Sequence, residues 1–178
     1  MLNLLGLVLL GLGSLASSWV APEETGYAVL FNGVNLYILR AWAPGPSSPN
    51  YLKGLTNIHE LPLGWAWAID WGEEVDYPFW MKDCYIPLTL VCADAQGLVV
   101  DVHRLTPLSE ESYTPGRPYR YAVEIEQGVL DIKPGWWLGI HRPGSGHQVP
   151  RRSPAAAAPP SSYPAKPPSP LLARLPPG

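Results

Sequence analysis

The segment Pro78–Leu88 constrains the fold of this chain more than any other part of the sequence. Aromatic residues, a methionine, a cysteine, Lys82 and Asp83 are crowded between two prolines, and the chain continues directly into the apolar run 89–94. A solvated loop would not carry so many large apolar side chains. We therefore expect most of the segment to be buried, with Lys82 and Asp83 paired or at the edge of a cleft. Replacing a buried Trp80 by alanine would cost roughly 3–5 kcal/mol.

Alternating side chains predict a strand just before this segment. Every second residue of the run 65–71 is a tryptophan or an isoleucine, with alanine or aspartate between them. This period of two is typical of a strand with one face in a core or a groove. The triplet 72–74 is expected to turn the chain back toward Pro78–Leu88.

Further alternation and turn residues predict a sheet of short strands. The runs 27–31 and 34–39 flank Asn32-Gly33, whose residues tolerate the positive φ of a two-residue hairpin turn. Gly97 can occupy the left-handed position of a turn over 94–97. The remaining strands are expected at 88–93, 98–105, 120–127 and 136–141.

One short helix is expected before the tryptophan-rich strand. Leucine or isoleucine recurs every third residue from 52 to 61, although Gly54 weakens this pattern and Pro62 ends it. The run 107–118 is too polar and proline-broken for a strand, and it is long enough to be a functional loop. With about seven strands and one short helix, the expected fold class is mainly β, a small barrel or a β-roll.

Composition divides the 178 residues into three parts. Residues 1–21 carry no charge, which is typical of a signal peptide or an uncleaved membrane anchor; a buried segment of the folded protein is a further alternative. Residues 24–142 form the expected β-rich globular domain. Residues 143–178 hold 11 of the 22 prolines and cannot form a core, so a disordered Pro/Ala-rich tail with polyproline II character is expected.

The tail is basic and the rest of the chain is acidic. Arg151, Arg152, Lys166 and Arg174 give the tail a charge of +4, and because the whole chain carries −3, residues 1–142 carry −7. We interpret the tail as a soluble spacer, with binding to an anionic envelope polymer or phospholipid as the alternative. Four dispersed cations without a recognisable nucleic-acid-binding fold do not favour nucleic acid as a partner.

Residues 79–88 read Phe-Trp-Met-Lys-Asp-Cys-Tyr-Ile-Pro-Leu, and they resemble the signature F-W-M-K-N-T-x-I-P-L-D of the prokaryotic family called domain of unknown function 192. Segments near 54–62, 64–65, 94–100 and 119–128 agree with that family in the same order. The resemblance covers roughly residues 26–142. It implies a compact β-rich domain, often exported, and it implies no catalytic activity.

The chain departs from the family pattern at several positions. Ile58 stands where the family usually has Arg, and Thr89 stands where it has the final Asp of the signature. Other substitutions are Trp65 and Trp67 for Met and Phe, and Asp83-Cys84 for Asn-Thr. An activity that depends on the family's polar residues is therefore not implied for this chain.

The pair Lys82 and Asp83 is the strongest candidate for a site. A semi-buried lysine normally has a carboxylate partner, with Glu124 or Asp70 as candidates, and a structural ion pair is the simpler interpretation. The alternative is a cleft in which flat aromatic faces and Lys82 bind an anionic or hydroxylated ligand. The candidate cleft consists of Trp65, Trp67, Trp80, Lys82, Asp83, Tyr85 and Glu124.

Cys84 and Cys92 leave three alternatives open. In an exported protein they could form a disulfide, provided that their Cα atoms lie close enough. They could equally be two buried thiols without reactivity. The third alternative is a nucleophilic Cys84, since the nearby cation of Lys82 would favour a thiolate.

Two further pairs of polar residues lie two positions apart, and each shares one face of a strand. Asp101 and His103 are too few to hold a metal ion, and no metal or cofactor is expected. Glu124 and Glu126 could act as paired carboxylates, but their face is more simply interpreted as solvated.

Together, these features favour a non-enzymatic extracytoplasmic binding or structural module, secreted or anchored, that touches a membrane only through residues 1–21. Exposed tryptophan faces suit saccharides or peptides, so the ligand would be one of these or another cell-envelope component. The alternative is an envelope-directed hydrolase that uses carboxylates and Lys82 in the aromatic cleft. The two differ in whether Lys82, Asp83, Glu124 and Asp101 converge in one concave pocket.

Overall fold

The computed structural model describes residues 7–9 and 24–143. Within these ranges it contains strands and no helix, so the predicted mainly β fold class is confirmed. The strands are β1 (Leu7–Leu9), β2 (Thr25–Phe31), β3 (Leu36–Trp42), β4 (Trp65–Val75), β5 (Leu88–Ala93), β6 (Val99–Leu105), β7 (Tyr119–Glu126) and β8 (Trp137–His141).

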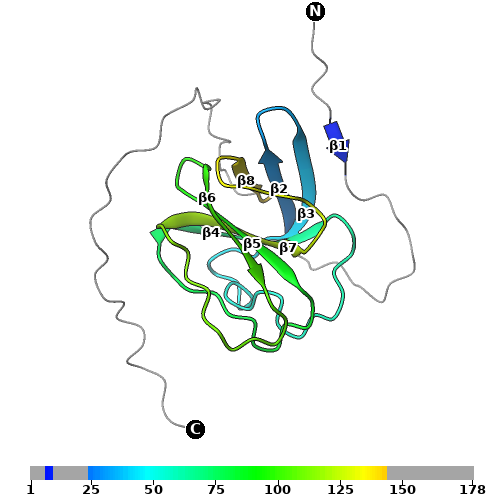
Figure 1. The fold of residues 1–178 in the computed structure, drawn as a ribbon, viewed down its shortest axis with the longest axis vertical. Coiled ribbons are helices and arrows are strands. Elements are labelled where there is room, and N and C mark those ends of the chain that lie inside the picture. The colour runs from blue at the N-terminus through cyan, green and yellow to red at the C-terminus, as the bar shows by residue number, and fades with distance from the viewer. Residues whose placement is uncertain (1–6, 10–23, 144–178) are drawn as a thin grey trace, which may run out of the picture.

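The strands β2 to β8 form one sheet in the order β6-β5-β7-β4-β3-β2-β8, and β1 pairs in parallel with β3 (Figure 1). The outer strands β6 and β8 approach each other at an isolated bridge between Leu98 and Trp137. Beside this bridge, Leu138 N donates to Gly97 O at 2.7 Å. Because no continuous ladder joins the described strands β6 and β8, the sheet is an open β-roll and not a closed barrel.

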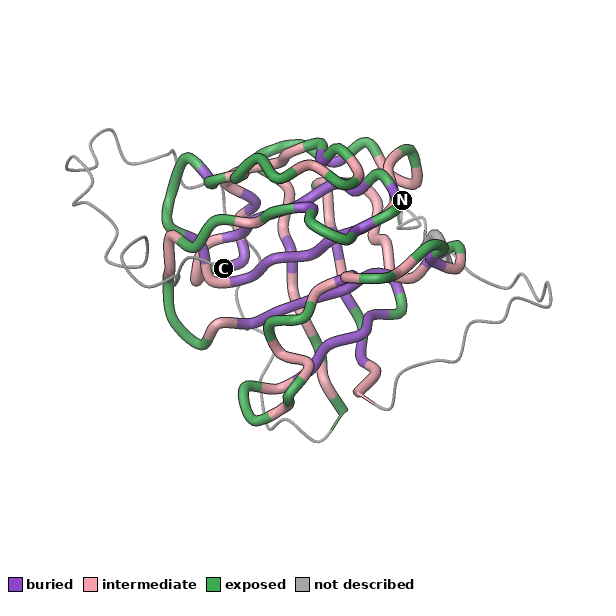
Figure 2. Tube along the Cα trace, turned by 90° about the horizontal axis from the view of Figure 1, so that it is seen from below, coloured by how far each residue is buried: buried purple, intermediate pink, exposed green. Residues whose placement is uncertain are grey.

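Two apolar clusters lie on opposite faces of this sheet. The inner cluster lies inside the roll and receives side chains from β2 to β8, among them Leu30, Leu39, Val91, Val123 and Leu138. The outer cluster lies between the sheet and the long connections, and includes Leu55, Trp67, Met81, Ile86 and Leu90. Figure 2 shows the buried stretches of the strands crossing one another in the middle of the molecule.

The tryptophan-rich strand β4 is buried on both faces. Trp67 and Ile69 enter the outer cluster, as the alternation predicted, whereas Ala66 and Ala68 enter the inner cluster. Their small side chains let the opposite wall of the roll pack closely against β4. The sequence pattern predicted one buried face, and the alanines account for the second.

The predicted hairpin is confirmed, since β2 and β3 pair in antiparallel fashion. The loop contains four residues, 32–35, and not two. Gly33 has the expected positive φ, at 93°. The Oδ1 atom of Asn32 accepts hydrogen bonds from the backbone N–H groups of Val34 and Asn35 at 2.9 and 2.7 Å.

Two local predictions are wrong. Residues 72–74 do not turn the chain back, because β4 continues to Val75 with a shift of register after Asp70. The helix expected between 52 and 61 is replaced by turns. Gly54 and Asn57 adopt φ values of 60° and 62°, in the left-handed region that a right-handed helix cannot contain.

Two predicted segments lie almost wholly beyond the described ranges. The signal peptide or anchor of residues 1–21 lies outside them except for Leu7–Leu9. The basic tail of residues 143–178 lies outside them except for Pro143. In the part of the chain that the structure describes, no helix has the length and apolar character needed to cross a membrane.

Candidate functional site

The signature segment, Pro78–Leu88, is bound along one side to the loop between β6 and β7. Phe79 and Tyr113 form an isolated antiparallel bridge, in which their N–H groups donate to each other's carbonyls at 2.9 and 2.8 Å. Leu108 N donates to Cys84 O at 2.9 Å. The loop predicted between 107 and 118 is therefore part of the framework that positions the signature segment.

The other side of the signature segment is bound to the connection between β3 and β4. Asn57 N donates to Asp83 O at 2.7 Å, and Tyr85 N donates to Ile58 O at 3.4 Å. Asp83 itself has φ of 58°, so the chain turns sharply there. Contacts on both sides fix the backbone of the segment.

Only part of the signature segment is buried. Met81, Cys84 and Ile86 enter the outer cluster. Trp80 is 58% exposed and Tyr85 is 41% exposed, so the prediction that Trp80 is buried is wrong. Adjacent side chains of an extended chain point in opposite directions, so Met81 and Trp80 cannot both enter the cluster.

The exposed side chains of this region form the signature surface, which we define as Trp80, Lys82, Tyr85, His59 and Leu108. The Lys82 Nζ atom lies 5.8 Å from the centre of the Trp80 ring. Tyr85 stacks on His59 with ring centres 4.0 Å apart and planes inclined by 20°. Leu108 is 55% exposed, and its backbone N–H donates to Cys84 O at 2.9 Å. The signature surface thus offers flat apolar faces together with a cation.

Glu124 and Trp67 lie inside the molecule, away from solvent. They are neighbours across the β4–β7 pair, and Leu90 of β5 is the neighbour of Glu124 on the other side. Burial raises the pKa of Glu124 to about 7. The prediction that its strand face is solvated is wrong, because the connection that contains Gly54 covers it; a Cβ atom at Gly54 would lie 3.8 Å from Glu124 Oε2.

The remaining candidates do not complete an open cleft. Trp65 is half-buried, with the Arg40 guanidinium 5.9 Å from its ring. Asp70 is not the ion-pair partner of Lys82, because it accepts two hydrogen bonds from Arg120 at 2.8 and 3.2 Å. Lys82 is exposed rather than semi-buried. The candidates therefore divide into the exposed Trp80, Lys82, Asp83 and Tyr85 of the signature segment, the half-buried Trp65, and the buried Trp67 and Glu124.

Cys84 and Cys92 are free thiols, so they do not form the disulfide that was one of the three alternatives. Both are buried, which agrees with the alternative of two thiols without reactivity. Burial, followed by the proximity of Glu124, raises the pKa of Cys84 to about 11. Burial also raises the pKa of Cys92 well above its usual value. The expectation that Lys82 favours a Cys84 thiolate is wrong, because desolvation dominates.

Asp101 and His103 do lie together, with Asp101 Oδ2 3.2 Å from His103 Nε2. The same Asp101 oxygen accepts a hydrogen bond from Gly116 N at 2.6 Å. Among the described residues, no group of three or more His, Cys, Asp or Glu side chains could hold a metal ion. Asp101 thus holds the loop before β7 through Gly116.

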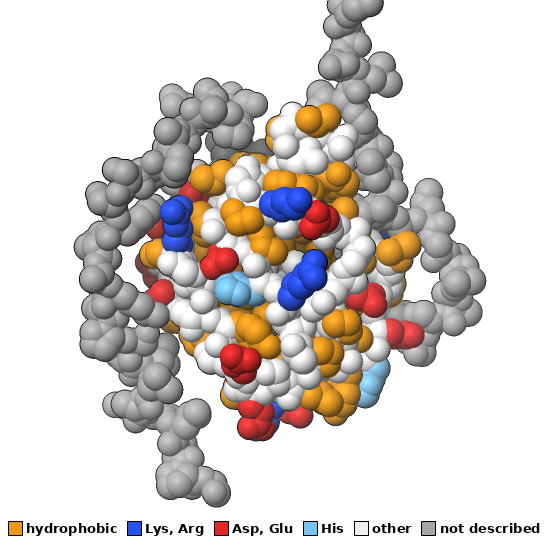
Figure 3. All heavy atoms as spheres, in the orientation of Figure 1, with side chains coloured by type: hydrophobic (Ala, Val, Ile, Leu, Met, Phe, Trp, Pro, Cys, Tyr) orange, Lys and Arg blue, Asp and Glu red, His pale blue; other side chains and the backbone are white. Residues whose placement is uncertain are grey.

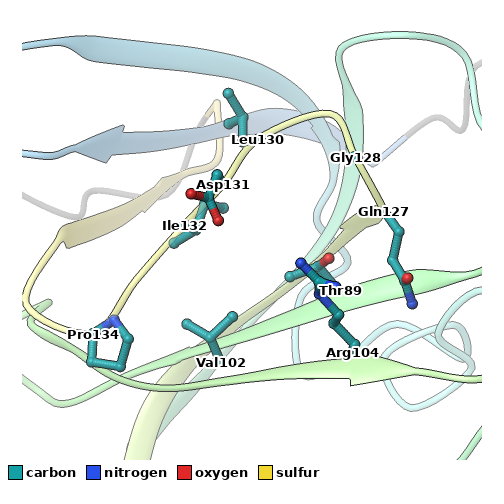
Figure 4. Close-up of a pocket in the computed structure, with 9 residues that line it drawn as sticks. All are labelled: Thr89, Val102, Arg104, Gln127, Gly128, Leu130, Asp131, Ile132 and Pro134. Carbon is teal, nitrogen blue, oxygen red and sulfur yellow. The ribbon is translucent and has the colours of Figure 1, made fainter.

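A cleft that the sequence did not reveal lies on the inner-cluster side of β5. Its volume is about 670 Å³, and it separates β5 and β6 from the connection between β7 and β8 (Figure 4). It is lined by Thr89, Val102, Arg104, Gln127, Gly128, Leu130, Asp131, Ile132 and Pro134. These residues come from three separate segments, and only the antiparallel pairing of Thr89 with Arg104 could have indicated any of their contacts.

Charged side chains are mixed on the face of the molecule shown in Figure 3. Lysines and arginines alternate there with acidic and hydrophobic side chains, and no continuous cationic stripe crosses this face. Such a distribution differs from the clustered positive charge that proteins use to follow a phosphate backbone.

Comparison with known proteins identifies a family and a fold. The model of the family DUF192, described as an uncharacterized ACR, matches residues 47–139. A candidate transcription regulator from Sinorhizobium meliloti 1021 shares 22% identity and a TM-score of 0.61, over 68% of this chain and 98% of that chain. A protein of unknown function from Novosphingobium aromaticivorans DSM 12444 shares 21% identity and a TM-score of 0.60, over 72% and 99%. These two likenesses show the fold alone. No match was found among curated proteins.

Proposed function

The chain belongs to the DUF192 family, and we propose that it is a non-enzymatic binding module that acts outside the cytoplasm, secreted or membrane-anchored. The signature surface contacts the ligand, which is a saccharide or peptide component of the cell envelope. The uncharged apolar residues 1–21 support the proposed location.

The exposure of Trp80 is the observation that carries this proposal. A tryptophan that is 58% exposed lies on a segment whose backbone is bound on both sides, so little conformational entropy is lost when a ligand packs on the ring. Tyr85 and Leu108, 41% and 55% exposed, extend the apolar area. Lys82 adds a donor for hydroxyl or anionic groups beside the aromatic face.

The geometry favours this proposal over an envelope-directed hydrolase. A hydrolase of that kind needs Lys82 and a carboxylate in one open cleft. Lys82 is exposed at the signature surface, whereas Glu124 is 5% exposed and Asp101 is bound to Gly116. A raised pKa suits Glu124 to proton transfer, but a substrate would first have to displace the connection that covers it.

Retention of the purified chain on insoluble cell-envelope material tests the proposal. We expect Trp80→Ala and Lys82→Met to reduce retention severalfold while leaving the midpoint of urea denaturation unchanged. Tyr27→Ala is the matched control, because Tyr27 is a 42% exposed aromatic residue on β2. Equal retention of all three variants would contradict the proposal. A loss of stability in Lys82→Met without a loss of retention would assign Lys82 to the scaffold.

A further inference from the structure

The cleft between β5, β6 and the β7–β8 connection has the size of a small-molecule site. Its volume of about 670 Å³ lies within the range of ligand pockets in proteins, roughly 300–1,000 Å³. It lies on the inner-cluster side of β5, whereas Met81, Cys84 and Ile86 of the signature segment pack on the outer-cluster side. The cleft is therefore separate from the signature surface.

One end of the cleft is polar. Thr89 and Arg104 are paired across β5 and β6, and Figure 4 shows their side chains next to each other, with Gln127 at the same end. Thr89 is a buried polar residue, 7% exposed. Arg104 is exposed and has no ion-pair partner among the described residues. The polar end thus combines a cation with a hydroxyl donor.

Gln127 fixes the geometry of this end. Its Nε2 group donates to the carbonyls of Leu88 and Leu105, each at 2.9 Å. These bonds use both amide hydrogens and hold the side chain across β5 and β6. The connection that forms the outer wall of the cleft is thereby fixed to the two strands at its start.

The other end of the cleft is apolar. Val102, Ile132 and Pro134 lie there, away from Arg104 in Figure 4. Ile132 is buried and belongs to the inner cluster, so this wall is part of the core. Asp131 is the acidic group of the lining, and Lys133 Nζ lies 3.1 Å from its Oδ2 atom in an exposed ion pair.

We propose that this cleft binds a small organic anion with an apolar body, such as a medium-chain carboxylate. The carboxylate accepts hydrogen bonds from Arg104 and from the Thr89 hydroxyl, and the hydrocarbon chain packs on Val102, Ile132 and Pro134. A charge-assisted bond to a guanidinium orients the ligand, and contact of the hydrocarbon with these apolar side chains adds to the affinity.

Isothermal titration calorimetry of the full chain with decanoate tests this proposal. We expect one saturable site, tighter binding of decanoate than of decanol, and no measurable binding of acetate. Arg104→Gln should weaken decanoate binding about tenfold and abolish the preference over decanol, because the charge-assisted bond is lost. Arg104 is exposed, so this variant should retain its fold.

Two further variants test whether decanoate binds at the cleft or elsewhere. Arg40→Gln removes a cation on β3 that lies against Trp65, and it should leave decanoate binding unchanged. Trp80→Ala should also leave it unchanged, because the signature surface is a different site. The absence of saturable binding, equal decanoate affinity in Arg104→Gln and the unaltered chain, or a loss of binding in Trp80→Ala would each overturn the proposal.

Discussion

At position 124 a carboxyl group lies in an apolar cluster between Trp67 and Leu90. The Glu124 side chain is 5% exposed. Burial of this kind penalises the ionised form, which explains why the pKa rises from 4.5 to about 7. The unfolded chain has no such penalty, so Glu124 makes stability depend on pH.

Glu124→Gln should remove this dependence. Between pH 4.5 and 7 the folded chain keeps the Glu124 proton while the unfolded chain loses it, so rising pH favours unfolding. The stability that this group contributes is complete below pH 4.5 and is lost as pH rises to about 7. We therefore expect the variant to gain on the order of 3 kcal/mol relative to the unaltered chain between pH 4.5 and 7.5. Urea denaturation at both pH values measures this difference, and a difference that stays constant with pH would contradict the argument.

Replacement by alanine should destabilise the protein much more at Trp67 than at Trp80. Trp67 is 2% exposed in the outer cluster, so Trp67→Ala should cost about 3–5 kcal/mol. Trp80 is 58% exposed, so Trp80→Ala should cost about 0.5 kcal/mol or less. Denaturation curves of both variants provide the comparison. Similar losses would show that the Trp80 ring packs against the protein in solution.

At the scale of elements, the strands could be predicted because their residues alternate with a period of two. The predicted run 88–93 coincides with β5. The runs 98–105 and 136–141 begin one residue before β6 and β8, and the run 120–127 is shifted by one residue from β7 at both ends. The helix prediction was wrong because Gly54 and Asn57 adopt left-handed backbone conformations, which the spacing of apolar residues does not reveal.

The candidate site could be predicted only in part. Trp80, Lys82 and Tyr85 were identified because the signature segment is dense in aromatic and charged residues. Their exposure was not predictable, since adjacent residues compete for the same buried space and composition does not decide between Trp80 and Met81. The burial of Glu124 depends on a connection that crosses β7 from a distant part of the sequence.

Gly97→Ala should destabilise the roll where β6 approaches β8. Gly97 has φ of 85°, and an added Cβ atom would lie 2.6 Å from Trp137 Nε1 and 2.7 Å from Leu138 O. Gly33→Ala is the matched control, because Gly33 has φ of 93° in open space. Each variant should lose about 1–2 kcal/mol from the left-handed conformation, and Gly97→Ala should lose at least about 1 kcal/mol more from the backbone contact. Equal losses in urea denaturation would show that β8 can move away without cost.

At the scale of the whole molecule, the sheet depends on strands that the family match leaves out. The match begins at residue 47, after β2 and β3. These strands contribute Ala28, Leu30, Leu39 and Ala41 to the inner cluster. β2 is also the strand that pairs with β8 along its whole length, so without β2 the strand β8 loses its only continuous ladder among the described strands.

A fragment of residues 47–143 should therefore fail to fold, whereas a fragment of residues 24–143 should unfold cooperatively. Without β2 and β3, one edge of β4 and the inner face of the roll are exposed, and the fragment buries too little apolar surface to offset its loss of conformational entropy. Near-ultraviolet circular dichroism is a sensitive measurement, because the buried Trp67 gives a signal only in a packed environment. A cooperative transition of the shorter fragment would mean that β4 to β7 and the outer cluster form an independent folding unit.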